Sequence, residues 1–170
     1  MKILQFIRAN AALSALVLLV LLIGGGIAYR RSDRVQIRRR FNRLADLAGR
    51  SPTESMIAMA ARSEQLSNLF AAKTELSIPV RGLTGEYSRR EIVQSAVRVK
   101  SQAESIELDF HDLKIREISG DKALCTVTAR LRAVINGERI NEVRELDCRL
   151  VREEGRWVFS SFSVAEILQR

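Results

Sequence analysis

Histidine, cysteine and proline are scarce in this sequence of 170 residues, which contains one histidine, two cysteines and two prolines. Histidine and cysteine are the usual zinc ligands, and neither occurs here at the spacing of a zinc site. The sequence also lacks a phosphate-binding glycine loop and a Gly-x-Ser-x-Gly nucleophile elbow. We therefore expect no metal site and no cofactor, and the sequence does not fit a loop-type nucleotide-binding protein or a serine hydrolase.

Positive charge is concentrated in the first part of the chain and balanced in the rest. Residues 1–50 contain 10 Lys and Arg against 2 Asp and Glu, whereas residues 51–170 contain 18 of each. The formal net charge of +8 therefore belongs to the first part alone. Nucleic-acid binding needs a basic surface on the folded domain, so we expect no nucleic-acid partner.

A long apolar run at 9–29 contains no charged residue. About 20 such residues cross a bilayer as a helix, whereas the apolar core of a signal peptide is shorter, at about 7 to 15 residues. We predict a short N-terminal tail at 1–8, a single transmembrane helix at 9–29 and a basic juxtamembrane helix at 30–48. The alternative is a cleaved signal peptide, because Gly26-Ile27-Ala28 offers small residues at a cleavage site.

Several arginines follow the apolar run, where anionic lipid head groups are their natural partners. The candidates for lipid contact are Arg30, Arg31, Arg34 and Arg38. By the positive-inside rule, these arginines favour a cytoplasmic domain. A short tail, one helix and a large domain are instead the usual plan of an exported, anchored protein, and we predict a bacterial inner-membrane protein with a periplasmic domain.

Two alternating runs between Ala123 and Val151 meet at Asn136-Gly137. Asn-Gly between alternating apolar residues is the strongest short-range hairpin signal, because both central positions of a type I′ turn need positive φ. A two-residue loop sets Cys125 opposite Cys148, and it places the apolar partners on one face. Cross-strand cysteines are within range of a disulfide, but they are equally typical of two small buried side chains, so both interpretations stay open.

Helical spacing and capping signals predict the remaining helices. An amphipathic helix covers 33–48, a second begins at the N-cap Ser51, a third covers 63–72, and a fourth runs from the capping box Ser88–Glu91 to Gln102. The apolar residues of the fourth helix, which we expect to be buried, are Ile92, Val93, Ala96 and Val99.

Between and after these helices the pattern is that of strands. We predict a short edge strand at 75–80, a loop at Gly82 and Gly85, and then four strands that form an antiparallel meander. The alternation changes phase at His111-Asp112, which predicts a bulge, and Glu153-Glu154-Gly155 predicts a three-residue loop before the last strand.

This order of elements predicts an α+β fold over 49–170, in which a strongly curved antiparallel sheet wraps around the N-terminal helices. Over 33–168 the order, together with Gly155-Arg156-Trp157-Val158-Phe159 at the start of the last strand, resembles the nuclear transport factor two-like superfamily, whose members include ketosteroid isomerases and dehydratases. The resemblance implies a cone-shaped, cystatin-like fold with a pocket between sheet and helices, and frequent dimerisation. A membrane helix before such a domain is similar to the assembly-factor subunit of type IV secretion systems.

Two sets of residues are candidates for function. Proton transfer in isomerase-like and dehydratase-like members needs a base and a hydrogen-bond donor in a dry cavity, and the candidates here are His111, Asp112 and Tyr87. We favour a solvated surface bulge for the first two, because the spacing places no second catalytic group opposite them. The outer face of the hairpin should carry an exposed apolar corner, a candidate contact surface formed by Leu124, Val151, Trp157 and Phe159.

We therefore predict a membrane-anchored, non-catalytic binding or scaffolding module of an envelope assembly. Its expected partners are membrane lipids and either a second copy of the chain or another protein. The alternative is a small-molecule-binding protein or an isomerase-like or dehydratase-like enzyme that uses the cone pocket, with a small apolar ligand.

Overall fold

The computed structural model describes residues 32–79 and 82–165. The expected tail at 1–8, the transmembrane helix at 9–29, and Arg30 and Arg31 lie outside the described residues. Within the described part, no helix is both long enough and apolar enough to cross a membrane. The chain divides into two compact units, Met1–Gln36 and Ile37–Arg170, and of the first unit only Ser32–Gln36 is described.

Three helices are described: α2 (Asp33–Ala48), α3 (Met56–Ser67) and α4 (Arg89–Gln102). The expected bounds of α2 and the end of α4 are confirmed. The capping box of α4 is confirmed as well, since Ser88 and Glu91 bond each other's backbone N–H. The N-cap of α3 is Ser55 rather than Ser51, and α3 is a single helix over the region in which two were expected.

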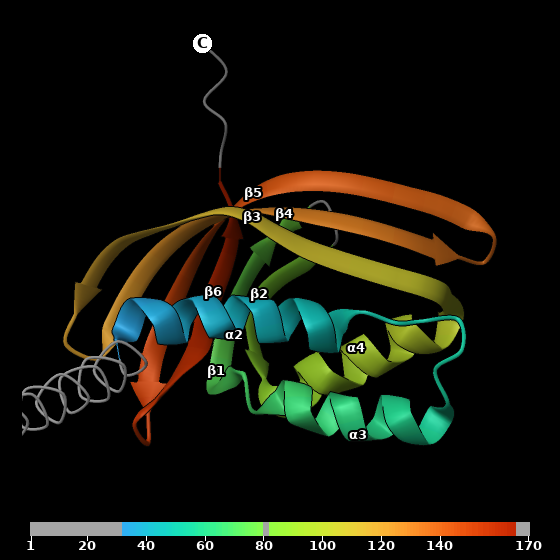
Figure 1. Ribbon diagram of the computed structural model, residues 1–170, viewed down its shortest axis with the longest axis horizontal. Coiled ribbons are helices and arrows are strands. Elements are labelled where there is room, and N and C mark those ends of the chain that lie inside the picture. The colour runs from blue at the N-terminus through green and yellow to red at the C-terminus, as the bar shows by residue number, and fades with distance from the viewer. Residues whose placement is uncertain (1–31, 80–81, 166–170) are drawn as a thin grey trace, which may run out of the picture. The chain divides into compact units, whose positions relative to one another are not determined.

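The strands are β1 (Phe70–Ile78), β2 (Leu83–Ser88), β3 (Ala103–Ser119), β4 (Lys122–Ile135), β5 (Glu138–Glu153) and β6 (Arg156–Val164). They form one sheet in the order β2-β1-β6-β5-β4-β3. Strand β1 pairs with β6 in parallel and every other neighbour pair is antiparallel, so the sheet is mixed rather than antiparallel. In Figure 1 the sheet is strongly curved, and α3 and α4 lie on the side below the long strands β3, β4 and β5.

Two errors of the sequence analysis concern β1 and β2. Phe70 and Ala71 continue the helical spacing of Leu66 and Leu69, yet they begin β1 because both are buried when β1 pairs with β6. The expected loop at Gly82 and Gly85 is largely strand β2, which pairs with β1 through Leu76 opposite Gly85. We interpreted both glycines as loop signals, but Gly85 lies within an edge strand, with φ 131°.

The central hairpin has the predicted register throughout. Cys125 lies opposite Cys148, and Ile135 opposite Glu138, across a turn in which Asn136 and Gly137 both have positive φ. The bulge predicted at His111-Asp112 is confirmed, because the β3–β4 register shifts there and Asp112 has φ 53°.

The hydrophobic core lies between the inner face of the sheet and the part of α2 that begins at Ile37. Phe41 packs edge-on against Phe159 and Phe110, with ring centroids 4.9 and 5.3 Å apart. Strand β6 contributes Trp157, Phe159 and Phe162 to this core, which fills the end of the sheet opposite to the Asn136-Gly137 turn. Toward that turn the space between the sheet and α4 is hollow.

Candidate functional site

An apolar cavity of about 470 Å³ lies between α4 and the sheet, and we refer to it as the apolar cavity. Its walls come from α4, from the paired ends of β1 and β2, and from the ends of β3, β4 and β5 near the hairpin turn. Aliphatic side chains make up most of the lining, among them Leu76, Leu83, Ile92, Ile106, Leu131 and Ile140.

The cavity meets solvent along α4. Val99 lines it and is exposed, as is Ser95 one turn earlier on the same helix. The expectation that Val99 is buried was therefore wrong. It assumed that the whole apolar face of α4 packs against the sheet, whereas part of this face borders a cavity.

Three polar side chains line the apolar cavity: Tyr87, Ser95 and Lys100. Tyr87 comes from β2 and lies half-buried directly before α4. Lys100 lies two turns after Ile92 on α4, so the same helix face presents an isoleucine, Ala96 and then a lysine. Tyr87 was expected as a site residue, and the structure places it at the cavity.

Lys100 is the most unusual of these groups, because its side chain is buried with only 1% exposed. Its Nζ donates a hydrogen bond to the carbonyl oxygen of Leu47, in the last turn of α2. Burial lowers the pKa of Lys100 and is the largest influence. The carboxylate of Glu54 opposes this effect, whereas Arg62 and Arg50 add to it.

Four charged residues form what we call the charge cluster: Arg50, Glu54, Arg62 and Lys100. Arg50 donates to the carbonyl oxygen of Lys100, and the Nε of Arg62 lies 3.4 Å from a carboxylate oxygen of Glu54. The Glu54 side chain is 5% exposed, and neither of its carboxylate oxygens accepts a hydrogen bond from the described residues. Of this cluster, Lys100 lines the apolar cavity, whereas Arg50 and Arg62 line a second hollow.

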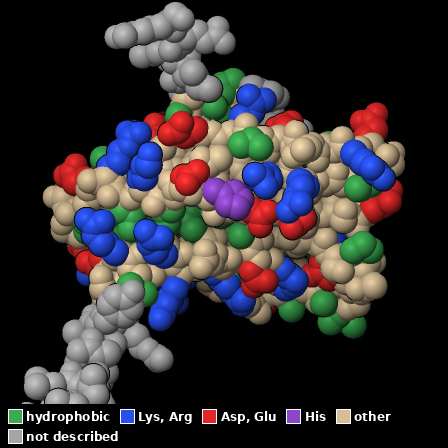
Figure 2. Space-filling model, turned by 45° about the horizontal axis from the view of Figure 1, so that its top comes forward, with side chains coloured by type: hydrophobic (Ala, Val, Ile, Leu, Met, Phe, Trp, Pro, Cys, Tyr) green, Lys and Arg blue, Asp and Glu red, His purple; other side chains and the backbone are tan. Residues whose placement is uncertain are grey.

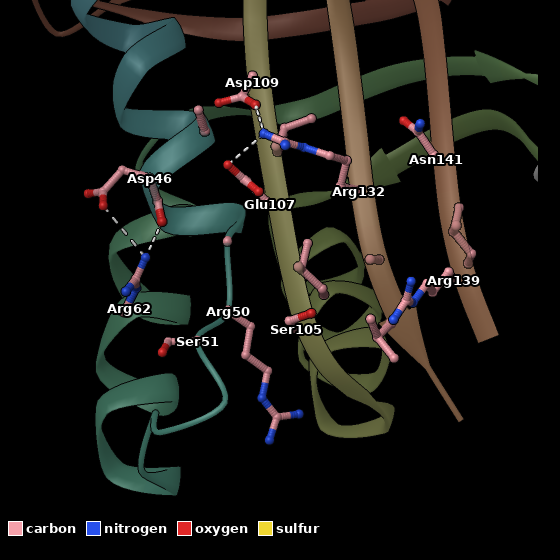
Figure 3. A pocket seen from close by; sticks show the side chains of 17 residues that line it. Asp46, Arg50, Ser51, Arg62, Ser105, Glu107, Asp109, Arg132, Arg139 and Asn141 are labelled. Carbon is pink, nitrogen blue, oxygen red and sulfur yellow. Dashed lines mark hydrogen bonds and ion pairs between the residues drawn. The ribbon is translucent and has the colours of Figure 1, made fainter. Parts of the chain in front are cut away.

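A second hollow, of about 710 Å³, lies along the edge of β3, and we call it the polar groove. Figure 3 shows Arg62 of α3 directed toward Asp46 of α2, and Arg132 of β4 reaching across to two carboxylates of β3. The nitrogen–oxygen distances are 3.6 Å from Arg62 to Asp46, 2.7 Å from Arg132 to Glu107 and 3.1 Å from Arg132 to Asp109. All three groove carboxylates are engaged by arginine. The groove shares Ile106 and Ile140 with the apolar cavity.

His111 and Asp112 are both exposed at the bulge of β3, and the histidine is the purple side chain on the surface in Figure 2. Strand β3 forms one edge of the sheet and β2, which carries Tyr87, forms the other. The fold therefore does not bring the three candidate catalytic residues together. His111 and Asp112 lie on a solvent-exposed bulge, as the sequence analysis favoured.

The expected exposed apolar corner is not formed. Trp157 and Phe159 are buried with 0% exposed, whereas Leu124 is 40% exposed and Val151 is half-buried. The physical reason is the turn between β5 and β6, which has two residues, Glu154 and Gly155, with positive φ, instead of three. This shorter turn shifts the pairing by one residue, so the start of β6 turns its aromatic side chains inward.

Pairing after the turn shows the same shift. Leu150 lies opposite Phe159 rather than Val158, and a bulge between Arg149 and Leu150 then sets Leu146 opposite Val164. Arg152 covers Trp157 from the neighbouring strand, with its guanidinium 4.7 Å from the ring centroid.

Cys125 and Cys148 are direct cross-strand neighbours, and the structure contains both as free, buried thiols. Burial raises the pKa of Cys125 to about 11 and also raises the pKa of Cys148. The sequence left two interpretations open, a disulfide or two small buried side chains. The structure has the second arrangement.

Of the four arginines proposed to contact lipid, Arg34 and Arg38 fall within the described residues, and both are exposed on α2. Among the described residues, no group of three or more His, Cys, Asp or Glu side chains is arranged to hold a metal ion.

Sequence analysis missed Lys100 as a candidate. A signal was present, because Ile92, Ala96 and Lys100 recur at intervals of four and so share one helix face. A lysine at the end of a helix usually extends to solvent, whereas the ammonium of this one donates to Leu47 at the end of α2.

No protein-family model and no curated protein matches this sequence. Solved structures of similar fold do exist. The protein Kfla4162 of Kribbella flavida has a TM-score of 0.66 at 17% identity, over 81% of this chain and 93% of its own. Hexachlorocyclohexane dehydrochlorinase (LinA) type 2 has a TM-score of 0.62 at 15% identity, over 78% of this chain and 83% of its own.

A third similar structure is an NTF2-like protein with a cystatin-like fold from Novosphingobium aromaticivorans. Its TM-score is 0.58 at 17% identity, over 81% of this chain and 84% of that one. The described domain thus has the nuclear transport factor two-like fold, as its element order predicted. At these identities, the likeness concerns the fold alone.

Proposed function

We propose that the domain binds a small, predominantly apolar molecule in the apolar cavity. The observation that carries this proposal is an open cavity of about 470 Å³ whose lining is aliphatic except for Tyr87, Ser95 and Lys100. Cavities of roughly 300 to 1,000 Å³ with apolar walls and a few polar groups are typical of small-molecule sites.

The energetics of the walls favour an occupant. Burying apolar surface contributes about 25 cal/mol per Å² removed from water, and the aliphatic walls of this cavity are reached by solvent along Ser95 and Val99. A molecule that enters on this side covers the walls and leaves the core around Phe159 unchanged.

This proposal takes the place of the scaffolding module expected from the sequence. The scaffolding hypothesis needed an exposed corner at Trp157 and Phe159, and both residues are buried. One protein of similar fold is, by name, a dehydrochlorinase of hexachlorocyclohexane, a small molecule without ionisable groups. That example agrees with the use of this fold for apolar small molecules.

We propose binding rather than turnover because of the groups that face the cavity. Isomerase-like and dehydratase-like chemistry uses a positioned base, most often histidine or a carboxylate. Within the described part of the chain, the lining of the apolar cavity includes no histidine, aspartate or glutamate.

The proposal is tested with 1-N-phenylnaphthylamine, an uncharged apolar dye whose fluorescence rises in apolar surroundings. We expect the full chain to bind the dye saturably. In Ala96→Phe a large side chain occupies the cavity, and we expect the affinity to fall by at least about tenfold, which is the loss of about 1.4 kcal/mol of binding free energy.

The matched control is Gln94→Phe, which adds the same side chain at an exposed position of α4 that does not line the cavity. The dye affinity of Gln94→Phe should equal that of the original chain in the same buffer. This comparison controls for dye that binds outside the cavity. Equal binding by Ala96→Phe and Gln94→Phe, with both variants folded by circular dichroism, would rule out the cavity as the binding site.

A further inference from the structure

We propose that Asn136 is a site of spontaneous deamidation and that the carboxylate of Glu104 slows this reaction in the folded chain. The modification concerns the exposed tip of the β4–β5 hairpin and is independent of the ligand proposed for the apolar cavity. Three observations lead to it: the residue pair at the turn, the hydrogen bond of the Gly137 backbone N–H, and the bulge that supplies Glu104.

The turn contains the one Asn-Gly pair of the sequence, and Asn136 and Gly137 are both exposed. In such a pair the backbone nitrogen of glycine attacks the side-chain carbonyl carbon of asparagine. The glycine nitrogen loses its proton and bonds to Cγ, and the side-chain nitrogen takes up a proton and leaves as ammonia. Water then opens the cyclic imide at either carbonyl, which gives aspartate or isoaspartate.

No side chain hinders this attack at the turn. Glycine has no Cβ, and a Cβ placed on Gly137 would meet no atom within 4 Å. Asn136 and Gly137 have φ of 52° and 80° and form the two-residue loop between the paired residues Ile135 and Glu138, so they lie outside the strand pairing. The reacting atoms are therefore open to water, which the second step consumes.

A carboxylate lies beside the attacking nitrogen. The backbone N–H of Gly137 donates a hydrogen bond to Oε1 of Glu104 at 3.2 Å. To attack, this nitrogen must lose its proton and gain negative charge. The hydrogen bond holds the proton in place, and the carboxylate repels the developing negative charge. Glu104 therefore acts against the reaction for as long as the fold keeps it at the turn.

A bulge at the start of β3 brings Glu104 to this position. Ala103 lies opposite Ile135 and Ser105 opposite Val134, and the β3–β4 register shifts between these two pairs, so Glu104 is the extra residue. Bulges often re-aim a side chain at the edge of a sheet, and β3 is an edge strand. The contact thus depends on how β3 pairs with β4 and not on the turn sequence alone.

The competing explanation is that Glu104 only braces the turn. The two roles differ in what they predict for a neutral side chain of the same shape. Glutamine accepts a hydrogen bond through its side-chain oxygen, so Glu104→Gln preserves the means of bracing the turn. The negative charge that opposes attack is lost in this variant, so deamidation should be faster.

The experiment incubates the full chain in mildly alkaline buffer and follows each asparagine by mass spectrometry of its peptides. We expect product at Asn136 before Asn141, which is followed by glutamate. In Glu104→Gln the rate at Asn136 should rise by at least about fivefold, the kinetic effect of about 1 kcal/mol. Glu117→Gln is the matched control, because it removes an exposed carboxylate near the other end of β3, and its rate should equal that of the original chain.

A second comparison, in denaturant, separates the fold from the local sequence. Glu104 and Gly137 are 33 positions apart, so unfolding removes their contact. The denatured original chain should deamidate at Asn136 faster than the folded chain, and at the same rate as denatured Glu104→Gln. This comparison within the original chain does not depend on the folding of any variant.

Every outcome supports or overturns the inference. If Asn136 reacts no faster than Asn141 in folded Glu104→Gln, Asn136 is not the site. Equal rates in the folded original chain and folded Glu104→Gln would overturn the role of Glu104, as would equal rates in the folded and denatured original chain. A slower reaction in Glu104→Gln would make the carboxylate a base that promotes attack and would also overturn it.

Discussion

At the scale of single residues, the ends of two helices explain where several cations of this domain lie. Lys100 and Arg62 donate to the carbonyl oxygens of Leu47 and Asp46 in the last turn of α2, and Arg50 donates to the carbonyl of Lys100 in the last turn of α4. The final carbonyls of a helix lack partners within the helix and carry partial negative charge. These contacts place Lys100 at the apolar cavity, and Arg50 and Arg62 at the polar groove.

Phe159 tests the correction of the β6 register. Replacement by alanine should lower the free energy of unfolding by about 3 to 5 kcal/mol, because the ring is buried against Phe41 and leaves a cavity. Chemical denaturation followed by circular dichroism measures the change. Val143→Ala is the control, since Val143 is 55% exposed, and it should change the value by no more than about 0.5 kcal/mol.

A Phe159→Ala variant that is as stable as the Val143→Ala control would contradict the burial of this ring. It would also restore the exposed corner that the alternation alone had favoured.

At the scale of elements, α4 is the helix that joins fold and candidate site. Its first turn is fixed by the capping box of Ser88 and Glu91, its middle lines the apolar cavity, and its last turn presents Lys100. The position of Lys100 along the cavity therefore depends on where the helix begins.

The capping box makes a prediction about stability and its dependence on pH. The hydroxyl of Ser88 accepts from the backbone N–H of Glu91 at 3.3 Å, and the Glu91 carboxylate accepts from the backbone N–H of Ser88 at 2.8 Å. Ser88→Ala should lower the free energy of unfolding by about 1 kcal/mol. Ser101→Ala, at an exposed position in the last turn of α4, is the control and should change it much less.

Hydrogen bonds from Ser88 lower the pKa of Glu91 below the usual glutamate value. The stabilisation by this carboxylate is therefore fully present above the usual glutamate pKa, and it is lost as the pH falls through the lower pKa of the folded state. Denaturation at neutral and at acidic pH should show the Ser88→Ala variant approaching the original chain as the pH falls. A difference that stays constant down to strongly acidic pH would argue against the carboxylate as a member of the cap.

At the scale of the whole molecule, the domain has two hollows of opposite character that share the wall formed by Ile106 and Ile140. The polar groove is lined by many charged side chains, several of them paired, whereas Lys100 is the one charged residue among the described lining residues of the apolar cavity. This difference is why we assign ligand binding to the apolar cavity and not to the larger groove.

Membrane attachment remains a prediction from the sequence for residues 9–29. We expect the full chain to stay with the membrane fraction after an alkaline carbonate wash. Leu18→Arg with Leu19→Arg should release much of it, because each central arginine costs about 2.5 to 3.5 kcal/mol on insertion. Arg98→Gln, at an exposed position of α4, is the control, and release of the original chain by the wash would contradict a spanning helix.

Local patterns by themselves determined much of this fold. Asn136-Gly137 fixes the register of the long hairpin because its turn geometry needs positive φ at both positions. The phase change at His111-Asp112 marks a bulge because an inserted residue shifts the alternation of the strand. The bounds of α2 and the capping box of α4 also follow from residues adjacent in the chain. Each of these features depends on contacts within a few residues.

The tertiary structure alone decided which faces are covered. Phe70 joins a strand rather than a helix because β6, distant in the sequence, pairs with it in parallel. Trp157 and Phe159 turn inward because one residue fewer in the turn reverses their phase. Lys100 is buried because its ammonium donates to the carbonyl of Leu47, at the end of α2. Such outcomes depend on packing between segments distant in sequence, where a shift of one residue moves a side chain from solvent to the core.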